Sequence, residues 1–144
     1  MFLFNKKDNQ PKDYTQLEVV AIHEAAHYWL GKANEEEGDI FIQQNPKTGR
    51  WGGCCLGCDG STNGALAGLA AELEIVGYKA EKDCCYNSDI RGYLGECGGS
   101  ERRFNRDLAK ARKAVRRNRK KILDLANEIL QPENFNSETN TYGW

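Results

Sequence analysis

The segment 19–30 limits most strongly how this chain can fold, because it is an apolar run that carries both histidines of the chain. His23 and His27 stand four residues apart, and the only charged residue of the segment, Glu24, follows the first of them. Residues four apart on an α-helix project from the same face, about one turn from each other. The segment therefore predicts a buried helix with two imidazoles directed into the protein.

The two ends of this helix are marked in the sequence. Thr15 and Glu18 have the spacing of a capping box, and Asp13 is an alternative N-cap. Gly31 is typical of the residue that follows a helix C-terminus. We expect the helix to run from about residue 15 to Gly31.

A β-hairpin is predicted next. Residues 39–44 are typical of a strand, and the following segment 45–49 contains the Asn, Pro and Gly that turns favour. Residues 50–55 would then return as a second strand.

Two more helices follow from apolar residues at three- and four-residue spacing. One covers 63–76, where small residues permit close packing on another helix. The other covers about 100–130, and its apolar stripe is interrupted at Asn118. The members of that stripe are Phe104, Leu108, Ala111, Val115, Ile122, Leu125 and Ile129.

These elements predict a mainly α (α+β) fold, a compact helical domain with a small β-hairpin or sheet. A length of 144 residues is near the commonest size of one domain. We expect a single domain over 1–144, with its core at about 14–130, a loose arm at 1–12 and a loose tail at 133–144.

The composition bears on the location of the protein. No apolar stretch approaches the roughly 20 residues that cross a bilayer, and no secretory signal is recognisable. We therefore expect a cytoplasmic protein without a membrane partner. Six cysteines are many for that location, and they leave three readings open: a second structural metal site, disulfides between the 54–58 and 84–97 regions, or free thiols. They are Cys54, Cys55, Cys58, Cys84, Cys85 and Cys97.

The charges are distributed unevenly. Residues 102–121 hold eleven of the twenty Lys and Arg and one acid, Asp107, whereas residues 1–101 sum to −7. This segment predicts a basic helix face that is either simply solvated or engages an anionic partner, such as nucleic acid or an acidic protein.

The pattern His-Glu-x-x-His at 23–27 points to zinc hydrolysis. Two imidazoles on one helix face can share a zinc ion, and a catalytic zinc keeps a position for water, whose pKa it lowers to about 7. Glu24 would act as the general base that takes the proton of the attacking water. The third ligand must be an acid or a thiol. The candidates are Glu72, Glu74, Asp83, Asp89 and the cysteines.

The chain resembles the protease domain of the FtsH-type AAA+ metalloproteases, a zincin. His23–His27 corresponds to the HEAGH motif of that family, and residues 39–55 resemble the hairpin that follows it. Residues 67–72 resemble its GGRAAE helix, and residues 87–90 stand at the place of its SND segment, with Asn and Ser exchanged. Residues 75–77 and 116–130 resemble the family's IxFG ending and its C-terminal helix.

The resemblance implies roles for individual residues. His23, His27 and Asp89 would be the metal ligands, and Glu72 would orient a ligand histidine. The returning strand, at Trp51, Gly52 and Gly53, would bind an extended peptide by strand addition, as zincins commonly do.

The ATPase module of that family is missing, because no GxxxxGK[ST] phosphate loop is present. The sequence therefore predicts an ATP-independent zinc metalloendopeptidase that acts on a peptide or protein substrate. One alternative is a metal-containing regulatory or binding module that uses the basic helix 102–121 to engage nucleic acid or a partner protein. Another is the hydrolysis of a non-peptide amide. The group that stabilises the oxyanion stays open among Tyr28, Tyr86 and Tyr93.

Overall fold

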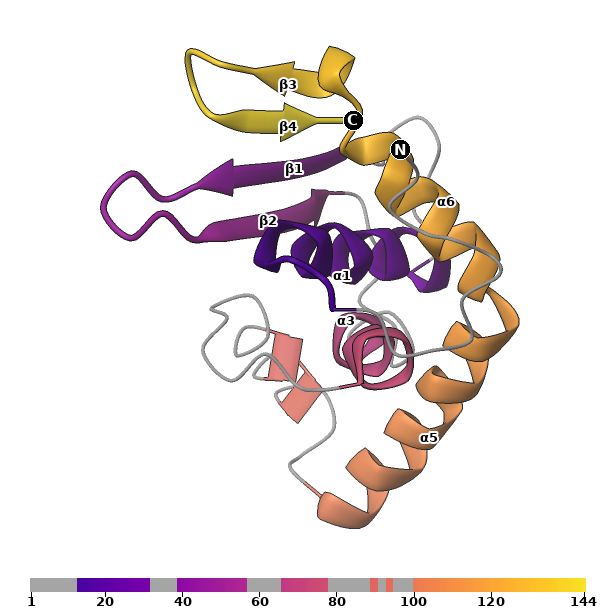
Figure 1. Cartoon of the computed structure of the whole chain (residues 1–144). Coiled ribbons are helices and arrows are strands. Elements are labelled where there is room, and N and C mark those ends of the chain that lie inside the picture. Colours follow the sequence, from indigo (N-terminus) through magenta and orange to yellow (C-terminus); the bar gives the residue numbers. More distant parts are fainter. Residues whose placement is uncertain (1–12, 32–38, 57–65, 78–88, 91–92, 95–99) are drawn as a thin grey trace.

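Helix α1 (Gln16–Leu30) lies between a small sheet and the other helices (Figure 1). The computed structural model describes residues 13–31, 39–56, 66–77, 89–90, 93–94 and 100–144. Within this part of the chain, α1 packs on the strands β1 and β2, on α3 and on α6. This central position explains why eleven of its fifteen residues are buried.

The predicted ends of α1 are confirmed. The Thr15 hydroxyl accepts a hydrogen bond from the backbone N–H of Glu18, and the Glu18 carboxylate accepts one from the backbone N–H of Thr15, each at 3.2 Å. At the other end, the N–H of Gly31 donates to the carbonyl of His27 at 2.8 Å. Thr15 rather than Asp13 is thus the N-cap, and such a cap stabilises a helix by about 1 kcal/mol.

The sheet has four antiparallel strands in the order β2-β1-β4-β3. The predicted hairpin is present as β1 (Asp39–Gln44) and β2 (Trp51–Leu56). Ile40 and Ile42 alternate with exposed residues along β1 and belong to the hydrophobic core. The sheet therefore buries one face on the helices.

The prediction of a loose tail at 133–144 is wrong. A short 3₁₀ helix, η2 (Pro132–Asn134), leads into β3 (Phe135–Asn136) and β4 (Thr141–Gly143). Ile40 and Trp144 exchange two backbone hydrogen bonds of 2.9 Å, so the tail satisfies the side of β1 that β2 leaves open. The ordered body therefore extends to the last residue, well beyond the predicted core limit of 130.

The second predicted helix begins within the described residues as α3 (Ala67–Ala71) and continues as a π-helix, η1 (Glu72–Val76). Residues 63–65 of the prediction lie outside the described residues. The N–H of Gly77 donates to the carbonyl of Glu72 at 2.7 Å, five residues back, and Gly77 ends the helix at a φ of 94°. Periodicity predicted a uniform α-helix here, and the π turn is a departure that occurs frequently at functional sites.

The long basic helix is two helices, α5 (Glu101–Arg117) and α6 (Arg119–Ile129). They meet at Asn118, where the side-chain amide donates to the Ala114 carbonyl at 2.8 Å. The predicted stripe faces the body of the protein along both helices, and its members from Ala111 onward are fully buried.

The observed architecture confirms the predicted fold class, mainly α (α+β), with a small antiparallel sheet. None of the helices in the described segments combines the length and apolar character needed to cross a membrane.

Candidate metal centre

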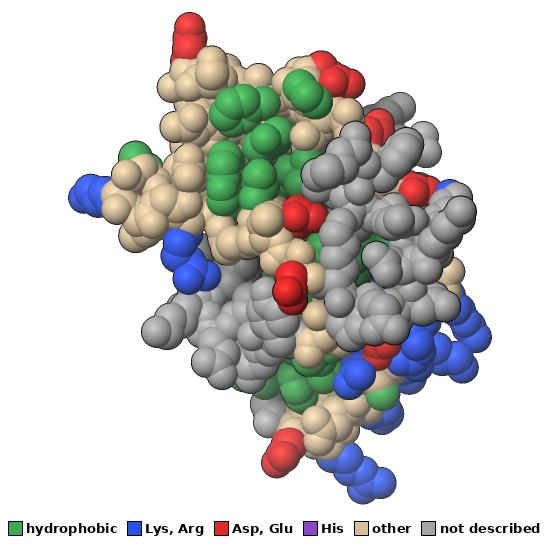
Figure 2. Space-filling view, viewed as in Figure 1, with side chains coloured by type: hydrophobic (Ala, Val, Ile, Leu, Met, Phe, Trp, Pro, Cys, Tyr) green, Lys and Arg blue, Asp and Glu red, His purple; other side chains and the backbone are tan. Residues whose placement is uncertain are grey.

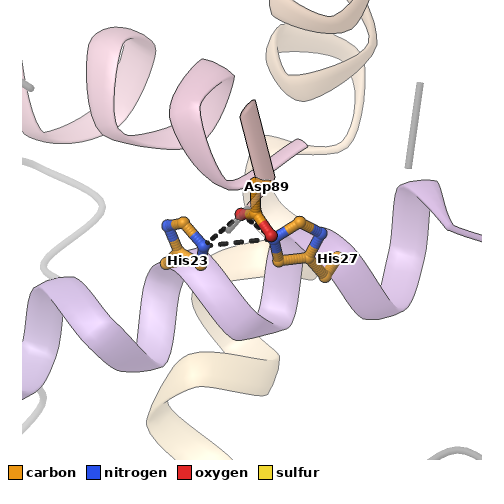
Figure 3. A group of neighbouring side chains, drawn as sticks. All are labelled: His23, His27 and Asp89. Atoms are coloured by element: carbon orange, nitrogen blue, oxygen red, sulfur yellow. Dashed lines mark hydrogen bonds and ion pairs between the residues drawn. The ribbon is translucent and has the colours of Figure 1, made fainter. Parts of the chain in front are cut away.

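Three side chains from two distant parts of the chain converge on one point (Figure 3). His23 and His27 lie on adjacent turns of α1, and Asp89 lies on the helical turn at 89–90. The Asp89 Oδ2 atom is 2.9 Å from His23 Nε2 and 2.7 Å from His27 Nε2, and the two Nε2 atoms are 3.1 Å apart. The structure therefore brings together the three residues that the resemblance implies as ligands.

The arrangement of these three atoms fits a zinc ion. Ligand atoms at 2.0–2.1 Å from a tetrahedral zinc lie about 3.3 Å from one another. The separations of 2.7 to 3.1 Å are about 0.2 to 0.6 Å shorter than that value, so the three side chains would part slightly to hold the ion. When both imidazoles are neutral and carry their proton on Nδ1, the two Nε2 atoms and the carboxylate oxygen each direct a lone pair toward one point, which suits a cation; without an ion, a proton on Nε2 makes the same contacts as hydrogen bonds.

His23 is the more deeply buried ligand, with a side chain that is 1% exposed. Burial alone would lower the pKa of its imidazole. The hydrogen bonds to Asp89 and Glu72 and the charge of Glu24 outweigh burial and hold the pKa well above 6.5. The surroundings of His23 therefore attract positive charge, whether that charge is a proton or a metal ion.

Asp89 is the ligand nearest to solvent, with a side chain that is 22% exposed. Burial would raise the pKa of its carboxyl group, but the contacts with His23 and His27 dominate and lower it to about 2. Asp89 is thus an anion at neutral pH, which is the form that binds a metal.

Glu72 lies behind His23. Its side chain is fully buried, and its Oε1 atom is 3.4 Å from His23 Nδ1, an ion-pair contact that is longer than an ordinary N–H···O hydrogen bond. This contact faces the ring nitrogen that points away from Asp89. A carboxylate in this place favours the tautomer with the proton on Nδ1, which leaves Nε2 free to ligate. The position agrees with the orienting role that the resemblance implies.

Glu24 points in another direction, toward β2. A methyl group at Gly53 would lie 2.8 Å from Glu24 Cγ, so the carboxylate side chain rests against the backbone of that strand. Partial burial, and then the negative charge of Glu24, raise the pKa of the neighbouring Cys54 thiol. The side chain of Glu24 is 2% exposed. The predicted base therefore lies between the ligand-bearing helix and the predicted substrate strand.

Gly68 of α3 makes room for His23. A methyl group at this position would lie 2.1 Å from His23 Cε1 and 2.3 Å from Nε2. The backbone of α3 therefore packs directly on the ligand ring. The sequence shows the small residues and the family resemblance of segment 67–72, but neither predicted that Gly68 contacts His23.

The open side of β2 is partly occupied by Gln16, a residue that sequence reasoning missed. Its side-chain amide donates to the Trp51 carbonyl and accepts from the Trp51 N–H, both at 2.7 Å. Both backbone groups of Trp51 are therefore occupied and do not pair with a substrate strand. All three predicted substrate-binding residues pair with β1; in addition, Gln16 holds Trp51, and Gly53 lies against Glu24. No signal in the sequence marks Gln16, because its partner lies 35 residues away.

Glu74, another candidate third ligand, faces α5. Its Oε1 atom contacts Arg112 at 2.6 Å and Arg116 at 2.7 Å. Asp83 lies outside the described residues. Glu74 is therefore part of the packing of α5 on η1.

The tyrosines proposed for the oxyanion are placed as follows. The Tyr93 hydroxyl donates to the Asp107 carboxylate of α5 at 2.9 Å, and Tyr28 packs edge to face on Trp144. Tyr86 lies outside the described residues. The contacts of Tyr93 and Tyr28 join elements of the fold.

Two of the six cysteines are described. Cys54 is an exposed free thiol, and Cys55 is disulfide-bonded. Cys58, Cys84, Cys85 and Cys97 lie outside the described residues. Of the three possibilities that the sequence left open (a metal site, disulfides or free thiols), Cys55 thus agrees with a disulfide.

Comparisons with protein families, with curated proteins and with solved structures find nothing that matches this chain. The chemistry of the site is therefore inferred from its own geometry.

Proposed function

We propose that this protein is an ATP-independent zinc metalloendopeptidase. The observation that carries the proposal is the convergence of His23, His27 and Asp89, with a buried glutamate directly after the first ligand. Neutral imidazoles and a carboxylate are ligands that zinc prefers, and a three-ligand set is typical of catalytic rather than structural zinc. We also propose a relation to the FtsH-type protease domain, which is supported by the order of these residues along the chain.

The zinc ion, when bound, supplies Lewis acidity at the reacting carbonyl and makes a water molecule more acidic. Glu24 accepts the proton of the attacking water and passes it to the leaving amine. Its burial keeps the carboxylate away from bulk solvent, and Gly53 allows the side chain to lie between α1 and β2. Glu72 holds His23 in the ligating tautomer through Nδ1.

The substrate in this proposal is an extended peptide that pairs with β2. Among the described strands, β2 is the outermost on the side of α1 (Figure 1). Backbone pairing recognises any peptide segment, so it suits an endopeptidase of broad sequence preference. Because Gln16 holds Trp51, pairing is limited to the part of β2 that follows Trp51.

A cytoplasmic location stays a prediction. The disulfide at Cys55 is more typical of an oxidising compartment. Cell fractionation of the tagged protein tests the location directly.

The activity is tested with the purified full chain and an unfolded protein such as casein. We expect one zinc ion bound per chain at this centre. A chelator should stop cleavage, and added zinc should restore it. Glu24→Gln should keep the metal and lower the rate by about 10²–10⁴, because an amide cannot accept the proton. Glu133→Gln, an exposed change of the same kind, serves as the control. A zinc-loaded protein without peptidase activity, or a fully active Glu24→Gln variant, would overturn the proposal.

A further inference from the structure

A row of exposed basic side chains runs along α5, on the side opposite its buried stripe. Arg103, Arg106, Lys110, Lys113 and Arg117 follow one another at spacings of three and four residues, and all are exposed. This spacing places them on one face of a helix, on average about half a turn from the buried Ala111 and Val115. Figure 2 shows Lys and Arg gathered along the side of the molecule where α5 runs. We call these five residues the basic row.

The basic row includes only some of the Lys and Arg residues of segment 102–121. Arg112 and Arg116 hold Glu74, and Arg119 donates to the Glu74 carbonyl at 3.3 Å. These three arginines therefore connect α5 and α6 to η1 through ion pairs and a hydrogen bond. Because that contact partly neutralises their charges, they do not belong to the basic row.

The basic row keeps most of its charge. Arg103 and Arg106 lie 3.7 and 3.6 Å from the buried carboxylate of Asp107. Among the residues that the structure describes, no acidic side chain pairs with Lys110, Lys113 or Arg117. Within the described residues, the five cations of the basic row thus have one carboxylate partner, Asp107, which Arg103 and Arg106 share.

We propose that the basic row binds the phosphodiester backbone of a nucleic acid, independently of the peptidase site. From Arg103 to Arg117 the helix rises about 21 Å, at 1.5 Å per residue. Duplex DNA carries one charge per about 1.7 Å of its axis, so a segment of this length presents many phosphates to a straight row of cations. The charge and the length of the two surfaces are complementary.

One feature of α5 favours a polyanion over a protein partner, and a second favours the backbone of a nucleic acid over its bases. Protein interfaces contain an apolar or aromatic centre, whereas the other exposed residues on α5 near the row are small or polar, such as Asn105 and Ala109. The one aromatic residue of the helix, Phe104, is half buried and packs on Tyr93. No exposed aromatic ring of α5 is thus present for base stacking, so the expected binding is electrostatic and without sequence preference.

The test is fluorescence anisotropy of a labelled 20-base-pair DNA duplex with the full chain, from about 50 to 200 mM salt. We expect binding that weakens steeply with salt, with a slope of about −0.9 per phosphate contacted. Lys110→Glu with Lys113→Glu should weaken binding at least tenfold and reduce the slope by about 1.8, the value for two lost contacts.

The matched control is Lys47→Glu with Arg50→Glu, which changes the net charge equally at exposed positions of the β1–β2 turn. This pair should leave the affinity within about threefold of the parent. If the α5 variant is unfolded by circular dichroism, Lys110→Gln with Lys113→Gln replaces it, with the same expected direction.

Three outcomes would overturn the proposal. The first is an absence of salt-dependent binding by the parent. The second is an equal loss of DNA affinity in the two charge-reversed double variants, which would indicate that binding depends on the net charge of the protein and not on a defined surface. The third is tighter binding of polyglutamate than of the duplex at equal charge, which would point to an acidic protein.

Discussion

Replacement of Gly68 by alanine should weaken zinc binding, because the added methyl group would displace the imidazole ring of His23. The added methyl group would lie 2.1, 2.3 and 2.5 Å from Cε1, Nε2 and Nδ1 of His23. Carbon atoms in contact are ordinarily about 3.5–4.0 Å apart. The ring, or the backbone of α3, must therefore move by about 1.4 Å or more, whereas metal–ligand distances tolerate only about 0.2 Å.

The size of the effect follows from this displacement. Loss of a single group that orients a metal ligand typically costs 10–100-fold in metal affinity, and here the ligand itself is displaced. We expect a loss of at least about 100-fold, which corresponds to about 2.7 kcal/mol. Overpacking a filled interior should also lower the free energy of unfolding of the metal-free protein by about 1–3 kcal/mol.

The assay is competition for zinc with a chromophoric chelator, together with thermal unfolding of the metal-free protein. Two other glycines supply controls on β2. The methyl group added by Gly52→Ala would have no atom within 4 Å, so this variant should change neither the zinc affinity nor the thermal unfolding. Gly53→Ala meets Glu24 Cγ at 2.8 Å, so it should keep zinc and lose turnover.

The reasoning is refuted if the folded Gly68→Ala variant binds zinc as tightly as the parent. In that case His23 would not be a ligand at the position where the structure places it. Equal losses of zinc affinity in the Gly68 and Gly52 variants would also contradict it, because only one of these glycines touches the ring.

Three further predictions concern the site and its support. Asp89→Asn should weaken zinc binding by at least tenfold in the chelator assay, since an amide oxygen is a poorer ligand than the anion; an unchanged affinity would contradict its role. Because the pKa of His23 is held well above 6.5 and a ligand ring must be neutral at the metal-binding nitrogen, zinc uptake at pH 7 should release a proton from His23 and weaken as the pH falls. Calorimetry in two buffers of different ionisation enthalpy counts that proton, and a count near zero would argue against the raised pKa. Arg112→Glu with Arg116→Glu should lower the melting temperature by several degrees without changing zinc affinity, because Glu74 would then face two like charges; an unchanged melting temperature would show that these ion pairs contribute nothing.

The local part of the site could be predicted from the sequence. The spacing of His23 and His27 needs only the helix period, and the capping box at Thr15 and Glu18 is equally local. The apolar flanks predicted that this helix would be buried, as it is. Helical geometry is repeated at every residue, so spacing alone places side chains on one face.

The third ligand could not be derived in this way. Asp89 lies 66 residues from His23, and spacing alone left several acids and the cysteines as equal candidates. The resemblance to a family selected Asp89 and Glu72, and the structure brings both to His23. Contacts between distant residues depend on how whole elements pack, and the sequence pattern of one element does not contain that information.

The tertiary structure alone decided the rest. The pairing of the tail with β1 was missed because a polar, two- or three-residue strand has no detectable period; its hydrogen bonds exist only because β1 offers an open side. Gln16 and Gly68 likewise gain their roles from neighbours that come from other elements. The sequence by itself determined the helices, their buried faces and the pair of histidines, because these depend on backbone periodicity; packing determined which carboxylates, glycines and strand edges surround that pair.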